Sequence, residues 1–143
     1  MKTQVLIATL IGAIVAFIAG WVIWGMLTMD YYNSNLSELY VSMISREKPI
    51  LWMIFVAQIV WALLLAYLFD QMNIKNFIDG MKCGAIIFFL IISGFDIMFH
   101  ASSDFFSNYT IIIVDILLNT VFGGIIGGVI GWWLGRSKET AAS

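Results

Sequence analysis

Residues 111–135 read IIIVDILLNTVFGGIIGGVIGWWLG, and the one charged side chain in this run is Asp115. An α-helix rises about 1.5 Å per residue, so a run of this length crosses a hydrocarbon core about 30 Å thick. Three further runs of similar composition occupy residues 5–29, 50–69 and 81–99. Because lipid offers no partner to backbone N–H and C=O groups, each run is expected to be helical. The sequence therefore predicts an all-α fold, a four-helix transmembrane bundle in which residues 1–143 form a single transmembrane domain.

The composition of the chain indicates the same surroundings. Hydrophobic residues make up 62% and charged residues 11% of the sequence, whereas soluble domains carry about 45–50% and about 25%. A soluble fold of this size could not bury so much apolar surface, and we expect the lipid bilayer to surround it. A net charge of −2 gives no reason to expect nucleic acid as a partner. Cys83 is the only cysteine, which excludes a disulfide within the chain, and no cofactor or metal is predicted.

Basic residues predict the orientation of the four spans. The side that holds both termini has five of them, Lys2, Lys75, Lys82, Arg136 and Lys138, and the other side has Arg46 and Lys48. The positive-inside rule therefore places both termini in the cytoplasm. The first span is longer than the apolar core of a signal peptide, which has about 7–15 residues, so we expect it to be retained.

The connection between the first two spans is long enough to hold structure of its own. Apolar residues recur there at helical spacing, at Leu36, Leu39, Tyr40, Met43 and Ile44. Asn35 followed by Glu38 resembles a capping box. These features predict a short amphipathic helix at residues 35–46. It either lies on the outer surface of the membrane or packs as a lid on the bundle.

Small residues form a row on the fourth span and another on the first. The rows consist of Gly123, Gly127, Gly131 and Gly135, and of Ala8, Gly12, Ala16 and Gly20. Such rows let helix backbones approach closely, so that dispersion contacts drive association in lipid. We predict that the first and fourth spans pack antiparallel along these rows. The alternative is a homo-oligomer built on the fourth span, and in either arrangement Gly127→Leu is expected to change stability or oligomer size.

Polar side chains in the outer part of the membrane are candidates for a small polar or ion site, namely Asp96, His100, Asp115 and Asn119. Asp115 and Asn119 share a stripe with Gly123, so both are expected to face the protein interior. Charged residues within a membrane usually mark a solute pathway, a proton site or a required pairing. The site would hold a proton or a cation. Alternatively, both aspartates only form hydrogen bonds between helices.

Sequence motifs of catalysis are absent: the chain has no nucleophile elbow, no His-Glu-x-x-His and no P-loop. His100 lies four residues from both Asp96 and Asp104, a spacing that a metal site on a helix can use. One histidine with two carboxylates is nevertheless a poor ligand set, and we predict neither a metal site nor an enzyme.

Aromatic residues gather near the outer ends of the spans. Interfacial belts of tryptophan and tyrosine are the simplest interpretation. Trp21 and Trp24, together with Phe95 and Phe99, are also candidates for the wall of an outer pocket.

The first span ends with VAFIAGWVIWG at residues 15–25, a segment of small and aromatic residues. With the polar connection that follows and the small residues of the last span, it resembles a family of small bacterial four-helix integral membrane proteins of unknown function. The resemblance implies a four-helix bundle in a bacterial inner membrane. Asp96, Asp115 and the glycine row lie outside the resemblance, so it assigns no site residues.

Two functional hypotheses follow from the sequence. The first is a non-enzymatic interaction module that packs its helices against a second copy or a larger membrane complex. The second is a small transporter or channel-like protein that uses Asp96 and Asp115 for protons or cations. The scarcity of polar residues, and the absence of a recognisable broken helix, favour the first hypothesis.

Overall fold

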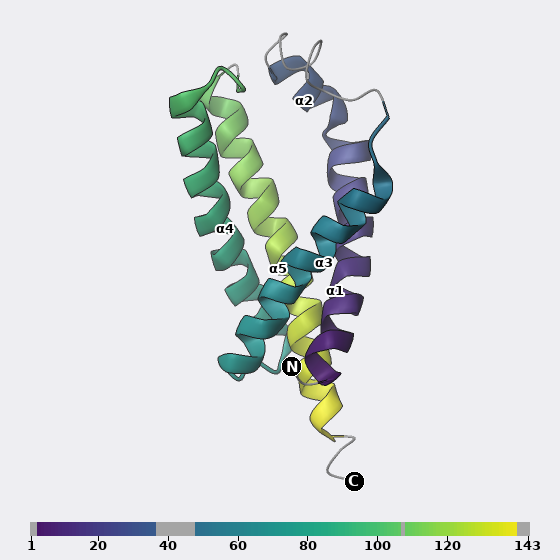
Figure 1. The fold of residues 1–143 in the computed structure, drawn as a ribbon. Helices are drawn as coiled ribbons and strands as arrows, with labels where there is room; N and C mark the ends of the chain where they lie inside the picture. Colours follow the sequence, from purple (N-terminus) through teal and green to yellow (C-terminus); the bar gives the residue numbers. More distant parts are fainter. Residues whose placement is uncertain (1–2, 37–47, 107, 140–143) are drawn as a thin grey trace.

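The computed structural model describes residues 3–36, 48–106 and 108–139, and the regular elements among them are all helices (Figure 1). They are α1 (Thr3–Gly20), the π-helix η1 (Trp21–Leu27), α2 (Met29–Asn35), α3 (Leu51–Gln71), α4 (Phe77–Ser102) and α5 (Tyr109–Glu139). Four stretches are long and apolar enough to cross a membrane: Thr3–Leu27, Leu51–Gln71, Phe77–Ser102 and Tyr109–Arg136. The predicted all-α, four-span fold is confirmed, and the chain is an integral membrane protein.

The four spans differ from the predicted bounds by a few residues, and the start of the third has a clear local cause. The third span starts at Phe77 because Asn76 caps it: the Asn76 Oδ1 atom accepts a hydrogen bond from the Asp79 N–H at 2.8 Å. The first span is followed at once by α2, which ends at Asn35. The amphipathic helix predicted at residues 35–46 lies almost entirely outside the described residues.

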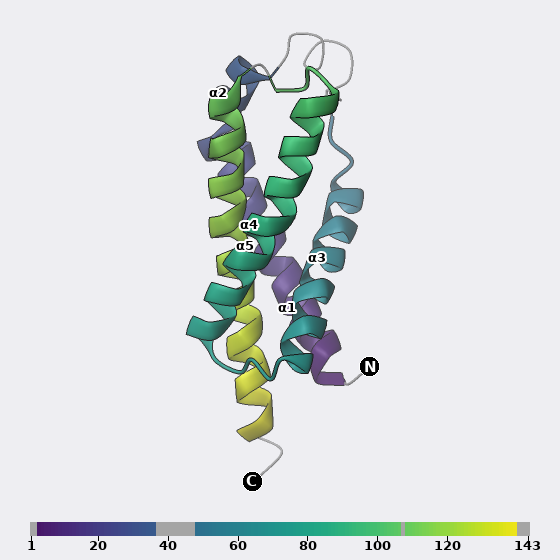
Figure 2. The same cartoon turned by 90° about the vertical axis from the view of Figure 1, so that its left-hand side faces the viewer.

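The helices form two pairs that separate toward one end of the molecule. The α4–α5 interface is the most extensive in the structure, and the α1–α3 interface comes next. Figures 1 and 2 show that α1 begins and α5 finishes at the same end, which we call the termini end. The pairs meet there and diverge toward the opposite end, which we call the α2 end.

The buried core lies at the termini end. It takes residues from the first part of α1, the last parts of α3 and α5, and the first part of α4, including Val5, Ala8, Leu65, Phe69, Phe88, Ile126 and Ile130. Lipid tails are as apolar as these side chains, so burial from lipid gives little hydrophobic stabilisation. The packing therefore stabilises the bundle mainly through dispersion contacts. The concentration of contacts at one end leaves the α2 end more loosely filled.

Glycines bring the backbones of α4 and α5 into direct contact. A Cβ atom on Gly127 would lie 2.3 Å from the backbone oxygen of Gly80, and one on Gly84 would lie 2.3 Å from the oxygen of Gly123. Gly131 faces the backbone oxygen of Asn76 in the same way, at 2.5 Å. The row on α5 therefore packs against Gly80 and Gly84 of α4, which the sequence interpretation had overlooked.

The predicted contact between the two small-residue rows is therefore wrong, although α1 and α5 do lie side by side. A Cβ atom on Gly12 would meet the Ile130 side chain at 2.7 Å and the Ala62 Cβ atom at 3.2 Å. Gly20 faces the ring of Phe122. Ala8 and Ala16 are fully buried. Gly12 and Gly20 of α1 thus receive larger side chains of α5, while the glycines of α5 face α4.

We predict that Gly127→Ala destabilises the protein by about 1–3 kcal/mol, because the new methyl group meets backbone that cannot rotate away. Gly94→Ala is the matched control, since it lies within α4 and a Cβ atom there has no heavy atom within 4 Å. Thermal unfolding of both variants in the same detergent gives the comparison. Equal midpoints for the two variants would contradict the close contact between α4 and α5.

Candidate functional site

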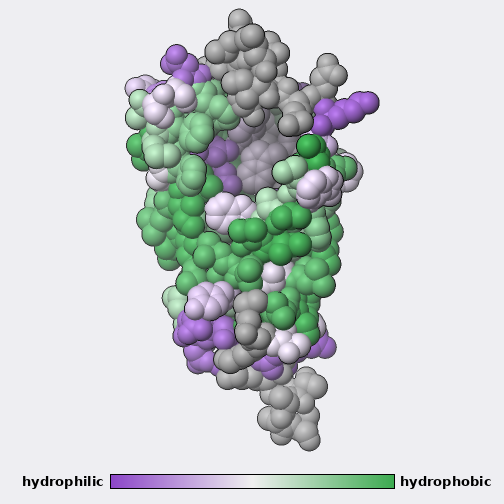
Figure 3. Space-filling model, viewed as in Figure 1, coloured by the Kyte–Doolittle hydropathy of each residue, from purple (hydrophilic) through white to green (hydrophobic). Residues whose placement is uncertain are grey.

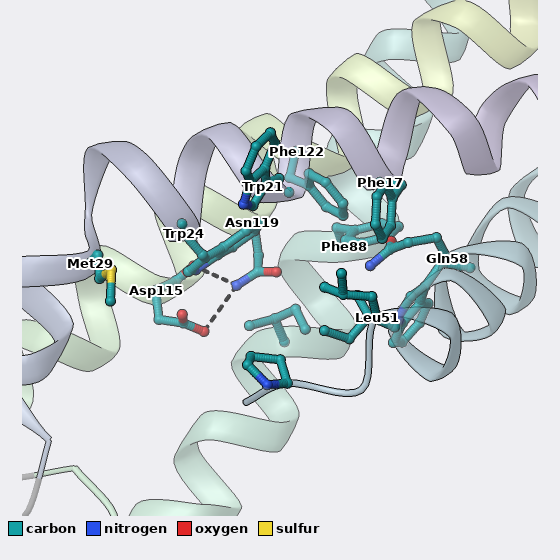
Figure 4. Close-up of a pocket in the computed structure, with 16 residues that line it drawn as sticks. Phe17, Trp21, Trp24, Met29, Leu51, Gln58, Phe88, Asp115, Asn119 and Phe122 are labelled. Carbon is teal, nitrogen blue, oxygen red and sulfur yellow. Dashed lines mark hydrogen bonds between the residues drawn. The ribbon is translucent and has the colours of Figure 1, made fainter. Parts of the chain in front are cut away.

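A cavity of about 740 Å³ lies between the two helix pairs on the α2 side of the core. Figure 3 shows the surface hollowed there, and Figure 4 shows the side chains that point into the space. Its walls are largely apolar and include six aromatic side chains, Phe17, Trp21, Trp24, Trp61, Phe88 and Phe122. The polar side chains in the lining are Gln58, Asp115 and Asn119, and none of the described lining residues is basic.

An aromatic series forms the floor of this cavity and joins the two pairs. The rings of Trp24 and Phe122 meet edge to face at 5.1 Å between centroids. Phe122 contacts Phe88 at 5.8 Å, and Phe88 contacts Trp61 at 5.3 Å. Because such aromatic contacts have preferred geometries, they hold the floor as a shaped surface.

One wall of the cavity is η1, where the first span widens from an α-helix into a π-helix. The backbone N–H of Thr28 donates to the Ile23 carbonyl oxygen at 3.0 Å, and the Thr28 hydroxyl donates to the same oxygen at 2.8 Å. A Cβ atom on Gly25 would lie 2.7 Å from Cδ1 of Trp21, so glycine leaves room for the indole ring. Single π-helical turns within helices are frequent at functional sites.

A hydrogen-bonded network joins η1 and α2 to α5 across the α2 end of the cavity. The Trp24 Nε1–H group donates to the Tyr32 hydroxyl oxygen at 3.3 Å, and the Tyr32 hydroxyl donates to Oδ1 of Asp115. The Asn119 amide donates to Oδ2 of Asp115 at 2.9 Å (Figure 4). Each carboxylate oxygen of Asp115 therefore receives a donor from the protein, and bonds to a charged acceptor are among the stronger hydrogen bonds.

Tyr32 lies in α2, outside the four spans, and its phenol keeps the proton that it donates to Asp115. Burial of the phenol, followed by its hydrogen bond to Asp115, raises the pKa of Tyr32 far above its ordinary value. Apolar contacts support this position: α2 packs against Ile111 and Ile112 at the start of α5 and against Phe106 in the connection before it. The Asn108 amide also donates to Oδ1 of Asn35 at 3.0 Å.

Asp96 is the second carboxyl group of this region, and 8% of its surface is exposed. It lies close enough to Asp115 for the two groups to interact electrostatically. Within the described part of the chain, the Asp96 Oδ2 atom has no hydrogen-bond partner. A buried polar atom without a partner costs free energy, so such atoms call for an explanation.

The structure unites three of the four predicted site residues. Asp115 and Asn119 share a hydrogen bond and line the cavity, and Asp96 interacts with Asp115. His100 instead packs its ring against Tyr109 at 4.7 Å between centroids. Among the residues that the structure describes, no group of three histidine, cysteine, aspartate or glutamate side chains is placed to hold a metal ion.

Some of the residues that line the cavity were predicted from the sequence. Trp21 and Trp24 line the cavity as one interpretation predicted, whereas Phe95 and Phe99 are exposed and are not part of the lining. The role of Tyr32 was missed. It lies 83 positions from Asp115 in the sequence, and no periodic pattern links two residues so far apart.

Comparisons with known proteins give no relatives for this arrangement. No family model matches the sequence, and neither the curated proteins nor the solved structures include a significant match. The resemblance to small four-helix membrane proteins stays a prediction, and any function has to be argued from the cavity itself.

We predict that Tyr32→Phe lowers the free energy of unfolding by about 1.5–3 kcal/mol, the usual value of a hydrogen bond to a charged group. The change leaves the ring in place but removes the donor to Asp115 and the acceptor for Trp24. Thermal unfolding in detergent, followed by tryptophan fluorescence, measures the loss. Tyr67→Phe, at a half-exposed position on α3, is the control. If both variants unfold at the same temperature, the network does not stabilise the α2 end.

Proposed function

We propose that the protein is a small carrier that binds a positively charged solute in the cavity, beside Asp115, and moves it across the membrane. The observation that supports this function is the combination of a ligand-sized space with a carboxylate on its wall and a second carboxyl group behind it. Ligand pockets typically have volumes of about 300–1,000 Å³ and a few well-placed polar groups among apolar walls.

The arrangement of the helices supports movement of one pair against the other. The α4–α5 and α1–α3 interfaces are the two most extensive, and the backbones of α4 and α5 are in direct contact. The pairs meet at the termini end and leave the cavity between them on the α2 side (Figure 1). Carriers commonly work by rocking two rigid units around a site between them.

The proposed orientation has both termini in the cytoplasm of a bacterial cell, with the protein in the inner membrane. Five basic residues of the sequence fall on the termini side and two on the other, which fits the positive-inside rule. The bacterial inner membrane comes from the resemblance of the first span. In this orientation the cavity belongs to the outer half of the membrane.

The glycine contacts argue against one form of the interaction module, a homo-oligomer built on α5. A homo-oligomer built on the glycines of α5 would use Gly123, Gly127 and Gly131, and these already face the backbone of α4 within the chain. A second copy would therefore have to displace α4 from its closest contact. A larger membrane complex stays a prediction from the sequence.

Reconstitution into liposomes tests the carrier. Uptake of rubidium-86 and of radiolabelled benzyltrimethylammonium would be measured under inward and outward pH gradients. We expect uptake of at least one of these cations, with a loss of most of the rate in Asp115→Asn, because the amide keeps the shape but removes the charge.

Asp30→Asn is the matched control, because Asp30 is an exposed carboxylate on α2. It should keep the wild-type rate. If the wild-type protein takes up neither cation under any gradient, or if both variants behave alike, the carrier proposal is wrong.

A further inference from the structure

The chemistry of the cavity specifies the kind of cation. Aromatic faces attract cations through their quadrupoles, and the attraction is stronger when both partners are desolvated. Six aromatic side chains surround the space, from α1, η1, α3, α4 and α5. Inorganic cations keep their hydration water unless oxygen ligands replace it, and this lining offers few oxygens. The walls therefore suit a cation that is already apolar on its surface.

The hydrogen bonds of Asp115 limit further which cations can bind beside it. Tyr32 donates to one carboxylate oxygen and Asn119 to the other. A ligand that brings its own N–H donors would compete with these two, whereas a ligand with a shielded charge needs only the field of the carboxylate. Gln58, on α3, adds an amide oxygen that is buried and has no hydrogen-bond partner among the described residues.

The charges around the cavity argue against an anionic ligand. The described lining residues include no lysine, arginine or histidine, so an anionic head group would enter unpaired beside Asp115. Burial of an unpaired charge is strongly unfavourable. A neutral acyl chain would fit the aromatic walls, but it would shield the carboxylate from water without supplying a positive charge to balance it.

We infer that the cavity takes a bulky organic cation with a shielded charge and no N–H donor, such as a quaternary ammonium or phosphonium ion with aromatic or branched substituents. This inference names the substrate class of the carrier proposed above and rests on that proposal for transport. The binding part can be tested separately. Asp115 supplies the charge, and Trp21, Trp24 and Phe122 supply the surfaces that contact the substituents.

Two probe ions of almost the same shape and opposite charge separate charge recognition from hydrophobic partition. Isothermal titration of the full chain, in a detergent with an uncharged head group, would compare tetraphenylphosphonium with tetraphenylborate. Empty micelles would supply the baseline. We expect the phosphonium to bind at least about tenfold more tightly, a ratio that corresponds to about 1.4 kcal/mol.

Variants assign the binding to this cavity. Asp115→Asn should weaken the phosphonium by about tenfold or more, and Asp30→Asn should not weaken it. Trp21→Leu is a second variant that does not depend on the core, because 67% of the Trp21 surface is exposed although it lines the cavity. Trp52→Leu is its control, since Trp52 is 68% exposed on α3 and is not part of the lining.

The outcomes distinguish the two proposals. Equal affinity for both ions, or phosphonium binding that survives both Asp115→Asn and Trp21→Leu, would overturn the cation assignment and leave the carrier proposal to its own uptake test. A phospholipid that stays bound through purification and blocks the phosphonium would overturn it as well. Selective phosphonium binding without any cation uptake in liposomes would uphold the site and overturn the carrier.

Discussion

The structure depends on the direct backbone contact between α4 and α5. Gly80, Gly84, Gly123 and Gly127 let the two backbones meet, and a methyl group on Gly80, Gly84 or Gly127 would lie 2.3 Å from a backbone carbonyl oxygen of the other helix. In lipid no hydrophobic driving force pushes helices together, so this close fit supplies the dispersion contacts that do. Because the contact lies in the first part of α4 and the last part of α5, it draws the core to the termini end. The opposite end can then remain open.

The α2 end lacks this close helix packing, and a hydrogen-bonded network together with a small apolar cluster stabilises it instead. Tyr32 bridges Trp24 and Asp115, while Ile111, Ile112 and Phe106 pack against α2. An aspartate within a membrane span costs about 2.5–3.5 kcal/mol on insertion scales. Two donors to Asp115 offset part of that cost. The network therefore serves stability and at the same time holds a carboxylate at a fixed place on the cavity wall.

The sequence predicted the helices because the apolar runs are long and the bilayer permits little else. It also predicted that Asp96, Asp115 and Asn119 belong together, since their depth and spacing were readable. It failed on the partner of the glycine row: Gly80 and Gly84 are a single pair, too short to stand out beside the four small residues of α1. It also missed Tyr32, because a contact between a connecting helix and a distant span leaves no periodic trace.

Stability alone does not account for Asp96. Tyr32 and Asn119 donate to Asp115, so both of its carboxylate oxygens have hydrogen-bond partners within the protein. Asp96 adds a second, buried carboxyl group beside it, with one oxygen that has no partner among the described residues. Two neighbouring carboxyl groups destabilise a fold when both are charged, and an apolar residue at Asp96 would pack at lower cost. A positive charge between the cavity walls and this pair would relieve the repulsion. The cation proposed for the cavity would therefore give this pair of carboxyl groups a role beyond the folding of the chain.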